Sequence, residues 1–187
     1  MNKPRLIVGI SGASGIIYGI RLLEALKSKP IDTHLIISKA SQLTRSLETG
    51  LSRADLSALA DVVYPNQDIA APIASGSFKT IGMVIAPCSM KTLGEIANGT
   101  GAGLIARAAD VTLKERRRLI IMPRETPLHL VHLKNMVAIS EMGGIVFPPV
   151  PAFYHKPETI DDLVNDHIGR VLDLLDIDND LAGRWAR

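Results

Sequence analysis

The segment P-R-E-T-P-L-H (123–129) places two charged residues, Arg124 and Glu125, directly after the apolar run 119–122. An unbroken apolar run is typical of a strand buried on both faces, and open α/β sheets bind ligands at the carboxyl ends of such strands. There a guanidinium can hold a phosphate through two parallel hydrogen bonds, while a neighbouring carboxylate can transfer protons. Taken alone, the segment fits equally well a simple ion pair in a surface loop.

A second segment that suits ligand binding is G-I-S-G-A-S-G (9–15), between an expected strand and an expected helix. Its glycines let the backbone approach a ligand closely, its serines add hydroxyl donors, and the helix N-terminus favours an anion. The spacing differs from the dinucleotide motif G-x-G-x-x-G, and the next strand ends in Ser38-Lys39 rather than in an acidic residue for a ribose. The pattern favours a mononucleotide over NAD, and a glycine turn used only for packing is the alternative.

A third segment, P-C-S-M-K-T (87–92), stands at another strand-to-helix junction. Ser89, Lys91 and Thr92 offer donors where unpaired backbone N–H groups also face outward. Cys88 has no His or Asp nearby in the sequence to activate it as a nucleophile, so a small buried packing residue is the favoured interpretation.

Cationic residues outside these junctions could extend a phosphate site. Arg107, Asp110 and Lys114 are three and four residues apart and share a helix face, which favours a surface ion-pair ladder over a positive wall for a phosphate. Tyr154 and Arg170 can donate to phosphate oxygens, or can be ordinary surface groups. The histidines show no spacing with carboxylates that would bind a metal, so no metal site is expected.

Strands and helices are expected to alternate along the chain, which predicts a parallel, doubly wound sheet in one domain spanning residues 1–187. The expected class is α/β, three-layered, and flavodoxin-like or Rossmann-like. Strands are expected at 5–8, 33–37, 82–86, 119–122 and 144–147, and helices at 15–28, 39–49, 53–60, just after 92, and at 103–116, 130–142 and 160–175.

The composition narrows the classes of partner. The chain has 187 residues with a formal net charge of +2, too little to indicate nucleic-acid binding. No apolar stretch reaches the roughly 20 residues that span a bilayer, and the first apolar run is too short for a signal peptide. With one cysteine, no intramolecular disulfide is possible. We therefore expect a cytoplasmic protein that acts on small molecules, without nucleic-acid or membrane partners.

Five segments together, in order, resemble a known family: G-I-S-G-A-S-G, P-C-S-M-K-T, R-A-A-D-V-T-L-K-E, P-R-E-T-P-L and P-P-V-P-A-F-Y. The combination resembles the UbiX/Pad1 family of flavin prenyltransferases, once described as aromatic-acid decarboxylases. The resemblance implies a homo-oligomer, often a dodecamer, that binds FMN between subunits. It implies that reduced FMN is joined to dimethylallyl monophosphate across flavin N5 and C6, without a metal. The product, prenylated FMN, would serve a UbiD-type decarboxylase.

The resemblance also implies roles for individual residues. Glu125 would be the acid/base, and a late tryptophan, Trp185, would lie near the site. Dimethylallyl phosphate would be held by Lys114, Tyr154 and Arg170, with Arg107 and Glu48 nearby. FMN would be contacted by Gly12, Ala13, Ser14, Ser38, Ser89, Met90, Lys91, Thr92 and Arg124.

Three other functions are compatible with parts of the sequence. Flavin-dependent decarboxylases of the cysteine type resemble the chain at the glycine loop, but they carry P-A-S-A-N-T where this chain has P-C-S-M-K-T. A carboxy-lyase acting directly on an aromatic acid is the second alternative. The third is a non-catalytic FMN carrier, which would not need Glu125 together with Lys114, Tyr154 and Arg170.

Overall fold

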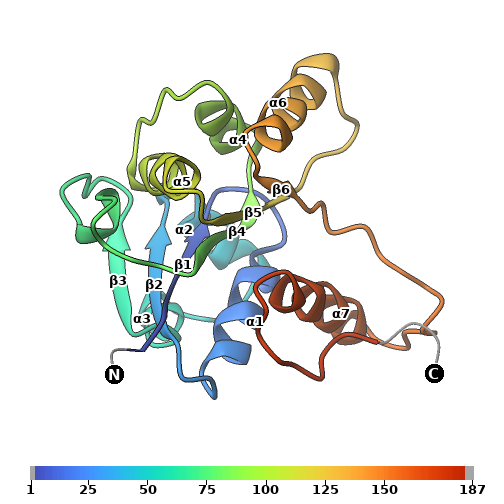
Figure 1. Cartoon of the computed structure of the whole chain (residues 1–187). Coiled ribbons are helices and arrows are strands. Elements are labelled where there is room, and N and C mark those ends of the chain that lie inside the picture. The colour runs from blue at the N-terminus through green and yellow to red at the C-terminus, as the bar shows by residue number, and fades with distance from the viewer. Residues whose placement is uncertain (1–2, 184–187) are drawn as a thin grey trace.

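The computed structural model describes residues 3–183 and contains one sheet of six parallel strands in the order β3-β2-β1-β4-β5-β6. The chain first winds outward from β1 to β3 and then crosses back to β4 on the other side of β1 (Figure 1). The strands are β1 (Arg5–Ile10), β2 (Asp32–Ile37), β3 (Val62–Pro65), β4 (Gly82–Cys88), β5 (Arg118–Pro123) and β6 (Ile145–Val146).

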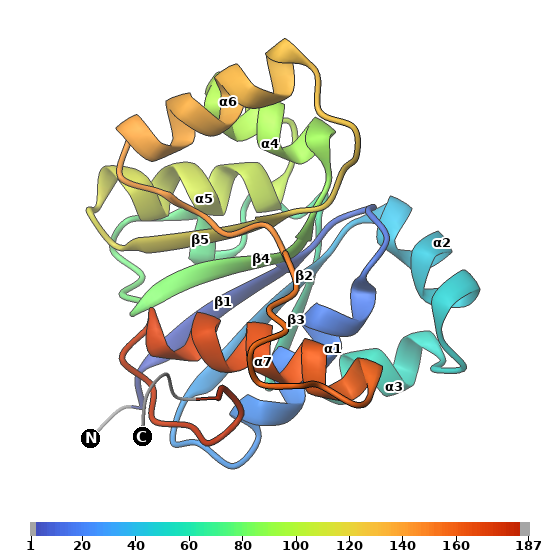
Figure 2. The same cartoon turned by 90° about the vertical axis from the view of Figure 1, so that its right-hand side faces the viewer.

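Helices cover both faces of this sheet, as Figure 2 shows from the side. The α-helices are α1 (Ile16–Leu26), α2 (Lys39–Glu48), α3 (Arg53–Ser57), α4 (Met90–Ala97), α5 (Leu104–Lys114), α6 (Leu130–Glu141) and α7 (Ile160–Asp173), and a short 3-10 helix, η1, spans Pro72–Ala74. Helices α1 and α7 pack against each other beneath the sheet, whereas α4 packs against α5 and α6 above it.

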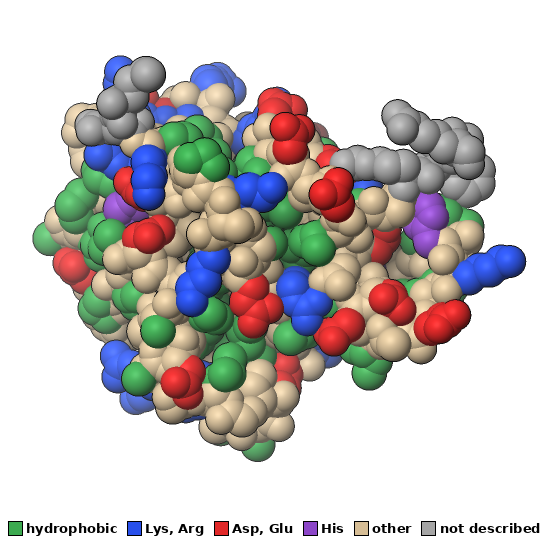
Figure 3. Space-filling model, turned by 90° about the horizontal axis from the view of Figure 1, so that it is seen from below, with side chains coloured by type: hydrophobic (Ala, Val, Ile, Leu, Met, Phe, Trp, Pro, Cys, Tyr) green, Lys and Arg blue, Asp and Glu red, His purple; other side chains and the backbone are tan. Residues whose placement is uncertain are grey.

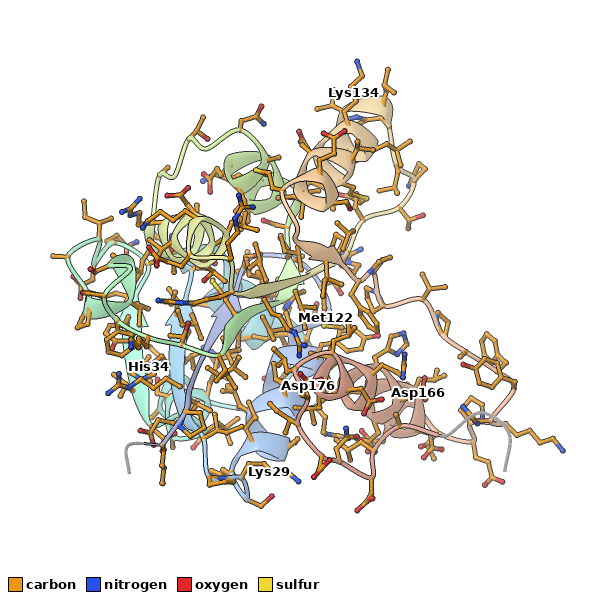
Figure 4. The ribbon with its side chains drawn as sticks, viewed as in Figure 1. Lys29, His34, Met122, Lys134, Asp166 and Asp176 are labelled. Atoms are coloured by element: carbon orange, nitrogen blue, oxygen red, sulfur yellow. The ribbon has the colours of Figure 1, made fainter. Side chains whose placement is uncertain are left out.

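The alternation of side chains along each strand divides the core into two. Leu6 and Val8 of β1 point to the cluster shared with α1, α3 and α7, and Ile7 points to the cluster shared with α4, α5 and α6. Met122, the last apolar residue of β5, belongs to the first cluster and is fully buried (Figure 4). Since both faces are covered, β4 is buried throughout and β5 is buried from its second residue on. The predicted three-layer, doubly wound fold is confirmed.

The sequence did not predict β3, which is the edge strand next to β2. This strand has only four residues, and Val62 and Val63 are each 38% exposed. A short, partly exposed edge strand lacks the long apolar run that identified the other strands. The missed strand matters because the loop after it, at Asn66 and Gln67, reaches the candidate site.

The surface carries charges of both signs. On the face seen from below, Lys and Arg side chains are interspersed with Asp and Glu (Figure 3). Within residues 3–183, no helix is both long and apolar enough to cross a bilayer.

Candidate active site

The loops that follow four of the parallel strands are hydrogen-bonded to one another at the carboxyl ends of the strands, which form one edge of the sheet. The Ser38 N–H donates to Ile10 O at 3.0 Å, which joins the ends of β2 and β1. The Ser11 N–H donates to Pro87 O at 3.2 Å, which joins β1 to β4, and the Arg124 N–H donates to Cys88 O at 3.2 Å, which joins β5 to β4. The predicted junctions therefore meet where the strand order reverses, the usual ligand position in open α/β sheets.

A cavity of about 720 Å³ opens at this edge, within the size range of small-molecule sites. Helices α2, α4 and α5 all begin at its wall, so partly positive N-termini from three helices converge on one space. Its lining comprises Gly12, Ser38, Lys39, Ala40, Leu43, Asn66, Gln67, Ser89, Lys91, Thr92, Glu95, Ala102, Gly103, Ile105 and Ala106.

A polar side chain caps each of these three helix starts. The Ser38 hydroxyl accepts from the Ser41 N–H, and the Ser89 hydroxyl accepts from the Thr92 N–H. Helix α5 has no side-chain cap of its own, and instead Asn66 Oδ1 accepts from the Ile105 N–H at 2.8 Å. Polar side chains at helix starts are favoured because they satisfy N–H groups that have no partner inside the helix. The caps fix the three walls of the cavity.

Five of the residues expected to contact FMN line this cavity: Gly12, Ser38, Ser89, Lys91 and Thr92. A methyl group added at Gly12 would lie 2.3 Å from Ala40 Cβ, so only glycine allows the loop to approach α2 this closely. The expected contacts Ala13, Ser14 and Met90 do not line the cavity. Ala13 is buried, Ser14 is exposed, and Met90 packs against the apolar core above the sheet.

The N-terminus of α1 is already paired with an anion. Glu48 Oε2 accepts hydrogen bonds from the Gly15 and Ile16 N–H groups, at 2.9 and 3.0 Å. The sequence placed a ligand anion at this helix start, but the structure places a carboxylate from α2 there. The convergent N-termini of α2, α4 and α5 are therefore the stronger anion-binding feature.

Arg124 and Glu125 do not pair with each other. Glu125 Oε1 accepts from the Thr126 N–H at 3.1 Å, and the Arg124 side chain has no hydrogen bond or ion pair among residues 3–183. Both side chains are exposed, and the Arg124 backbone is bonded to Cys88, which precedes the cavity-lining Ser89. The structure thus disfavours an ion pair between the two side chains, and it connects the Arg124 backbone to the segment that leads into the cavity.

The residues expected to hold dimethylallyl phosphate lie elsewhere on the chain. Arg107 pairs with Asp110 at 2.7 Å on α5, and Arg170 pairs with Asp173 at 3.0 Å on α7. Helices α5 and α7 cover opposite faces of the sheet (Figure 2). One chain therefore does not bring Arg107 and Arg170 together.

Lys114 and Tyr154 are also outside the cavity lining. Lys114 pairs with Glu115 at the far end of α5, about 14 Å along the helix from cavity-lining Ile105. Tyr154 is 61% exposed in the proline-rich loop, with its ring against that of His155. Trp185 lies outside the described residues.

The only cysteine is structural. Cys88 is fully buried at the end of β4, and burial raises the pKa of its thiol far above the usual range. A thiol that stays protonated is a poor nucleophile. Among residues 3–183, no group of three or more His, Cys, Asp or Glu side chains is arranged to hold a metal ion.

Sequence reasoning missed four polar or flexible parts of the cavity wall. Asn66 and Gln67 follow the unrecognised strand β3, and a V-V-Y run before a proline was the signal for it. The glycine-rich loop that ends at Gly103 was overlooked, although Gly-rich helix starts often bind anions. Glu95 was missed because it lies one turn inside α4.

Comparisons with known proteins agree on one family. The Flavoprotein family model matches residues 1–172. The "Flavin prenyltransferase UbiX" of Escherichia coli (strain K12) is 55% identical over 184 residues, covering 97% of each chain. The enzyme of the same name from Neisseria meningitidis serogroup B is 54% identical over 181 residues, covering 97% of this chain and 96% of that protein.

Solved structures give the same result. AnUbiX (PadA1), determined with FMN and dimethylallyl pyrophosphate, superposes with a TM-score of 0.97 at 46% identity, covering 99% of this chain and 98% of that one. A dodecameric FMN-dependent UbiX-like decarboxylase from Escherichia coli O157:H7 gives a TM-score of 0.95 at 50% identity, covering 98% and 100%. The cysteine decarboxylase TvaF shares the fold, at 18% identity and a TM-score of 0.61 over 76% of this chain and 88% of that one.

Proposed function

Because this chain belongs to the UbiX flavin prenyltransferases of the Flavoprotein family, we propose that its cavity at the sheet edge binds FMN for prenylation. The reaction joins a dimethylallyl group from dimethylallyl monophosphate to reduced FMN, at flavin N5 and C6, and releases phosphate. The observation that carries the proposal is the convergence of three helix N-termini on a cavity of about 720 Å³. This arrangement suits a ligand with one phosphate group.

The cavity side chains fit FMN chemically. The hydroxyls of Ser38, Ser89 and Thr92 stand at helix starts, and the Lys91 ammonium, which pairs with Glu95 at 3.6 Å, adds a positive charge. Gly12 lets the 9–15 loop lie directly against Ala40 at the start of α2, which brings the loop backbone and this helix N-terminus to the same cavity. We assign these residues, together with the backbone of the 9–15 loop and the Arg124 guanidinium, to FMN binding.

Glu125 and Arg124 supply the chemistry that the chain itself performs. Reduced FMN is the nucleophile: two bonds to the prenyl group replace its N5–H and C6–H bonds. The allylic C–O bond breaks as phosphate leaves, and the prenyl C=C bond is consumed and takes up one of the two protons released. Glu125, exposed in the loop after β5, accepts a proton as the new ring closes and can protonate the departing phosphate. Arg124, which has no ion-pair partner in the described chain, can neutralise phosphate charge and so assist cleavage of the allylic C–O bond.

We propose that neighbouring subunits complete the site. Arg107, Lys114, Tyr154 and Arg170 lie outside the cavity of their own chain, as described above. A homo-oligomer, as in the dodecameric relative, would bring these three cations and the Tyr154 hydroxyl to the cavity of an adjacent copy. Helix α6 supports such assembly because Leu130, Val131 and Val137 are 64%, 58% and 55% exposed, an unusual exposure for aliphatic side chains.

We also propose a destination for the product and a compartment. Prenylated FMN would pass to a UbiD-type decarboxylase, because a modified flavin made by a transferase needs an enzyme that uses it. A cytosolic location is supported by the single buried cysteine, which suits a reducing environment.

The decisive experiment mixes protein, reduced FMN and dimethylallyl monophosphate without oxygen, and measures the mass of the flavin. A mass gain of one prenyl unit is expected. Unchanged FMN would instead support a carrier, and loss of carboxylate from an aromatic acid without any partner enzyme would support a direct decarboxylase. A parallel reaction with dimethylallyl pyrophosphate, the compound bound in AnUbiX, decides which phosphate ester is used.

A further inference from the structure

The Ser11 hydroxyl forms hydrogen bonds that connect the 9–15 loop to residues 87–89, two parts of the chain that meet at the cavity. Ser11 is 1% exposed. Its Oγ donates to Pro87 O at 3.0 Å and accepts from the Ser89 N–H at 2.7 Å. Its backbone N–H also donates to Pro87 O, at 3.2 Å. Three hydrogen bonds therefore connect Ser11, in the 9–15 loop, to residues 87–89.

Each end of this connection positions a cavity wall. Ser89 begins α4, where its hydroxyl accepts from the Thr92 N–H and donates to Thr92 Oγ1. At the other end, Ser11 O accepts from the Ala13 N–H at 3.0 Å, which fixes the turn around cavity-lining Gly12. Movement of Ser11 would shift Gly12 and Ser89 relative to each other.

We propose that Ser11 is a positioning residue for FMN binding, which locks the 9–15 loop to the start of α4 before the ligand enters. Ser11 does not contact the flavin. The inference rests on the proposed function, in which FMN occupies this cavity. Groups held in place beforehand lose less conformational freedom on binding, so the lock raises affinity without adding a contact.

This role differs from the one that the sequence suggests. A serine in a glycine-rich loop is expected to donate its hydroxyl proton to the ligand. A hydroxyl carries a single proton, and that of Ser11 is donated to Pro87 O inside the protein. Ser11 therefore has no proton left for a phosphate, whereas exposed Ser14 keeps its own.

The test replaces Ser11 with alanine in the full-length protein. The Ser11→Ala variant leaves the Ser89 N–H without its acceptor, and buried groups that lose partners destabilise the arrangement they held. We expect the KM for reduced FMN to rise about tenfold, with kcat at saturating FMN within about twofold of wild type. Amide hydrogen exchange in residues 87–92 should become faster in the absence of FMN.

A matched control separates positioning from general loss of stability. Ser52 caps α3 by accepting from the Asp55 N–H, and it does not line the cavity. The Ser52→Ala variant should have a lower melting temperature, an unchanged KM for FMN and unchanged exchange at 87–92. Ser11→Thr, which keeps the hydroxyl, should restore most of the lost affinity.

Specific outcomes would overturn the proposal. These are a wild-type KM in Ser11→Ala, or an equal rise in KM in Ser52→Ala. If Ser11→Ala does not fold, Ser11→Cys is the second variant, since it keeps a small side chain but is a weak donor and acceptor. Wild-type affinity in a folded Ser11→Cys protein would contradict the lock. Failure of the wild-type protein itself to bind FMN would count against the proposed function instead.

Discussion

At the residue scale, the chemistry open to the candidate site depends on which side chains are bonded within the protein and which are exposed where the strands end. The end of the run 119–122 and the two strand-to-helix loops do meet, because parallel strands end on the same edge. Which groups these side chains bond to was harder to predict from the sequence. Ser11 bonds internally and Glu48 caps α1, and both depend on contacts between residues more than 30 positions apart.

Glu125 is the residue whose role is tested most directly. In a Glu125→Gln variant we expect normal FMN affinity, because the carboxylate lies outside the cavity lining, and product formation slower by about 10²- to 10⁴-fold, the usual contribution of an acid/base. Single-turnover assays with reduced FMN would measure the rate. The matched control is Glu141→Gln, at the exposed end of α6. Wild-type turnover in Glu125→Gln would remove the acid/base assignment.

At the element scale, long apolar or periodic runs in the sequence predicted the helices and the buried strands. The short run of the edge strand did not identify it as a strand. Strands β4 and β5 were found because they are buried on both faces and hence continuously apolar. Edge strand β3 was missed, and with it the Asn66 loop that caps α5. A cap supplied from another element leaves no pattern in the helix's own sequence, so it could not have been predicted.

The start of α1 offers a test of such a distant cap. Glu48→Ala should lower the free energy of unfolding by about 1 kcal/mol, because the Gly15 and Ile16 N–H groups lose their acceptor and the helix loses a compensating negative charge. Glu48→Gln should recover most of the loss, since an amide oxygen still accepts.

Urea denaturation is the appropriate measurement for these variants. Glu24→Ala is the control, because it removes only a surface ion pair with Arg21 on the same helix, of about 0.5 kcal/mol or less. An effect of Glu48→Ala no larger than that of Glu24→Ala would contradict the capping role.

At the scale of the whole molecule, we proposed that one chain carries only part of the site. Nothing in a single sequence fixes where Lys114 of one copy lies relative to the cavity of another, since that depends on how surfaces pack. The exposed aliphatic side chains of α6 were visible in the sequence only as an apolar helix. The fold shows which of these side chains face outward, and this exposure supports the proposed contact between copies.

The stability of the whole fold should depend on pH through His34. This buried side chain on β2 bonds to the Tyr64 hydroxyl at 3.0 Å and lies beside β3 (Figure 4). Burial lowers the pKa of His34, and the Arg5 charge lowers it further, against smaller opposing effects of Asp32 and Asp61. As the pH falls, the unfolded chain, with a histidine pKa of about 6.5, therefore binds a proton at a higher pH than the folded chain does. This difference lowers the stability of the folded chain.

The melting temperature should consequently fall between pH 7 and pH 5, and this fall should be smaller in His34→Leu than in the wild type. His155→Leu, at an exposed position, serves as the control and should keep the wild-type slope. Identical slopes in all three proteins would rule out His34 as the source of the acid sensitivity.

The burial of Cys88 has a consequence for an enzyme that handles reduced flavin. Reduced flavins react with oxygen to give hydrogen peroxide, which attacks thiolates but hardly reacts with protonated thiols. The chain's one sulfhydryl precedes Ser89 of the cavity wall, yet it is fully covered, and burial raises its pKa so that the protonated form is favoured. Peroxide from the side reaction of reduced flavin with air therefore finds no accessible thiol in this chain to oxidise.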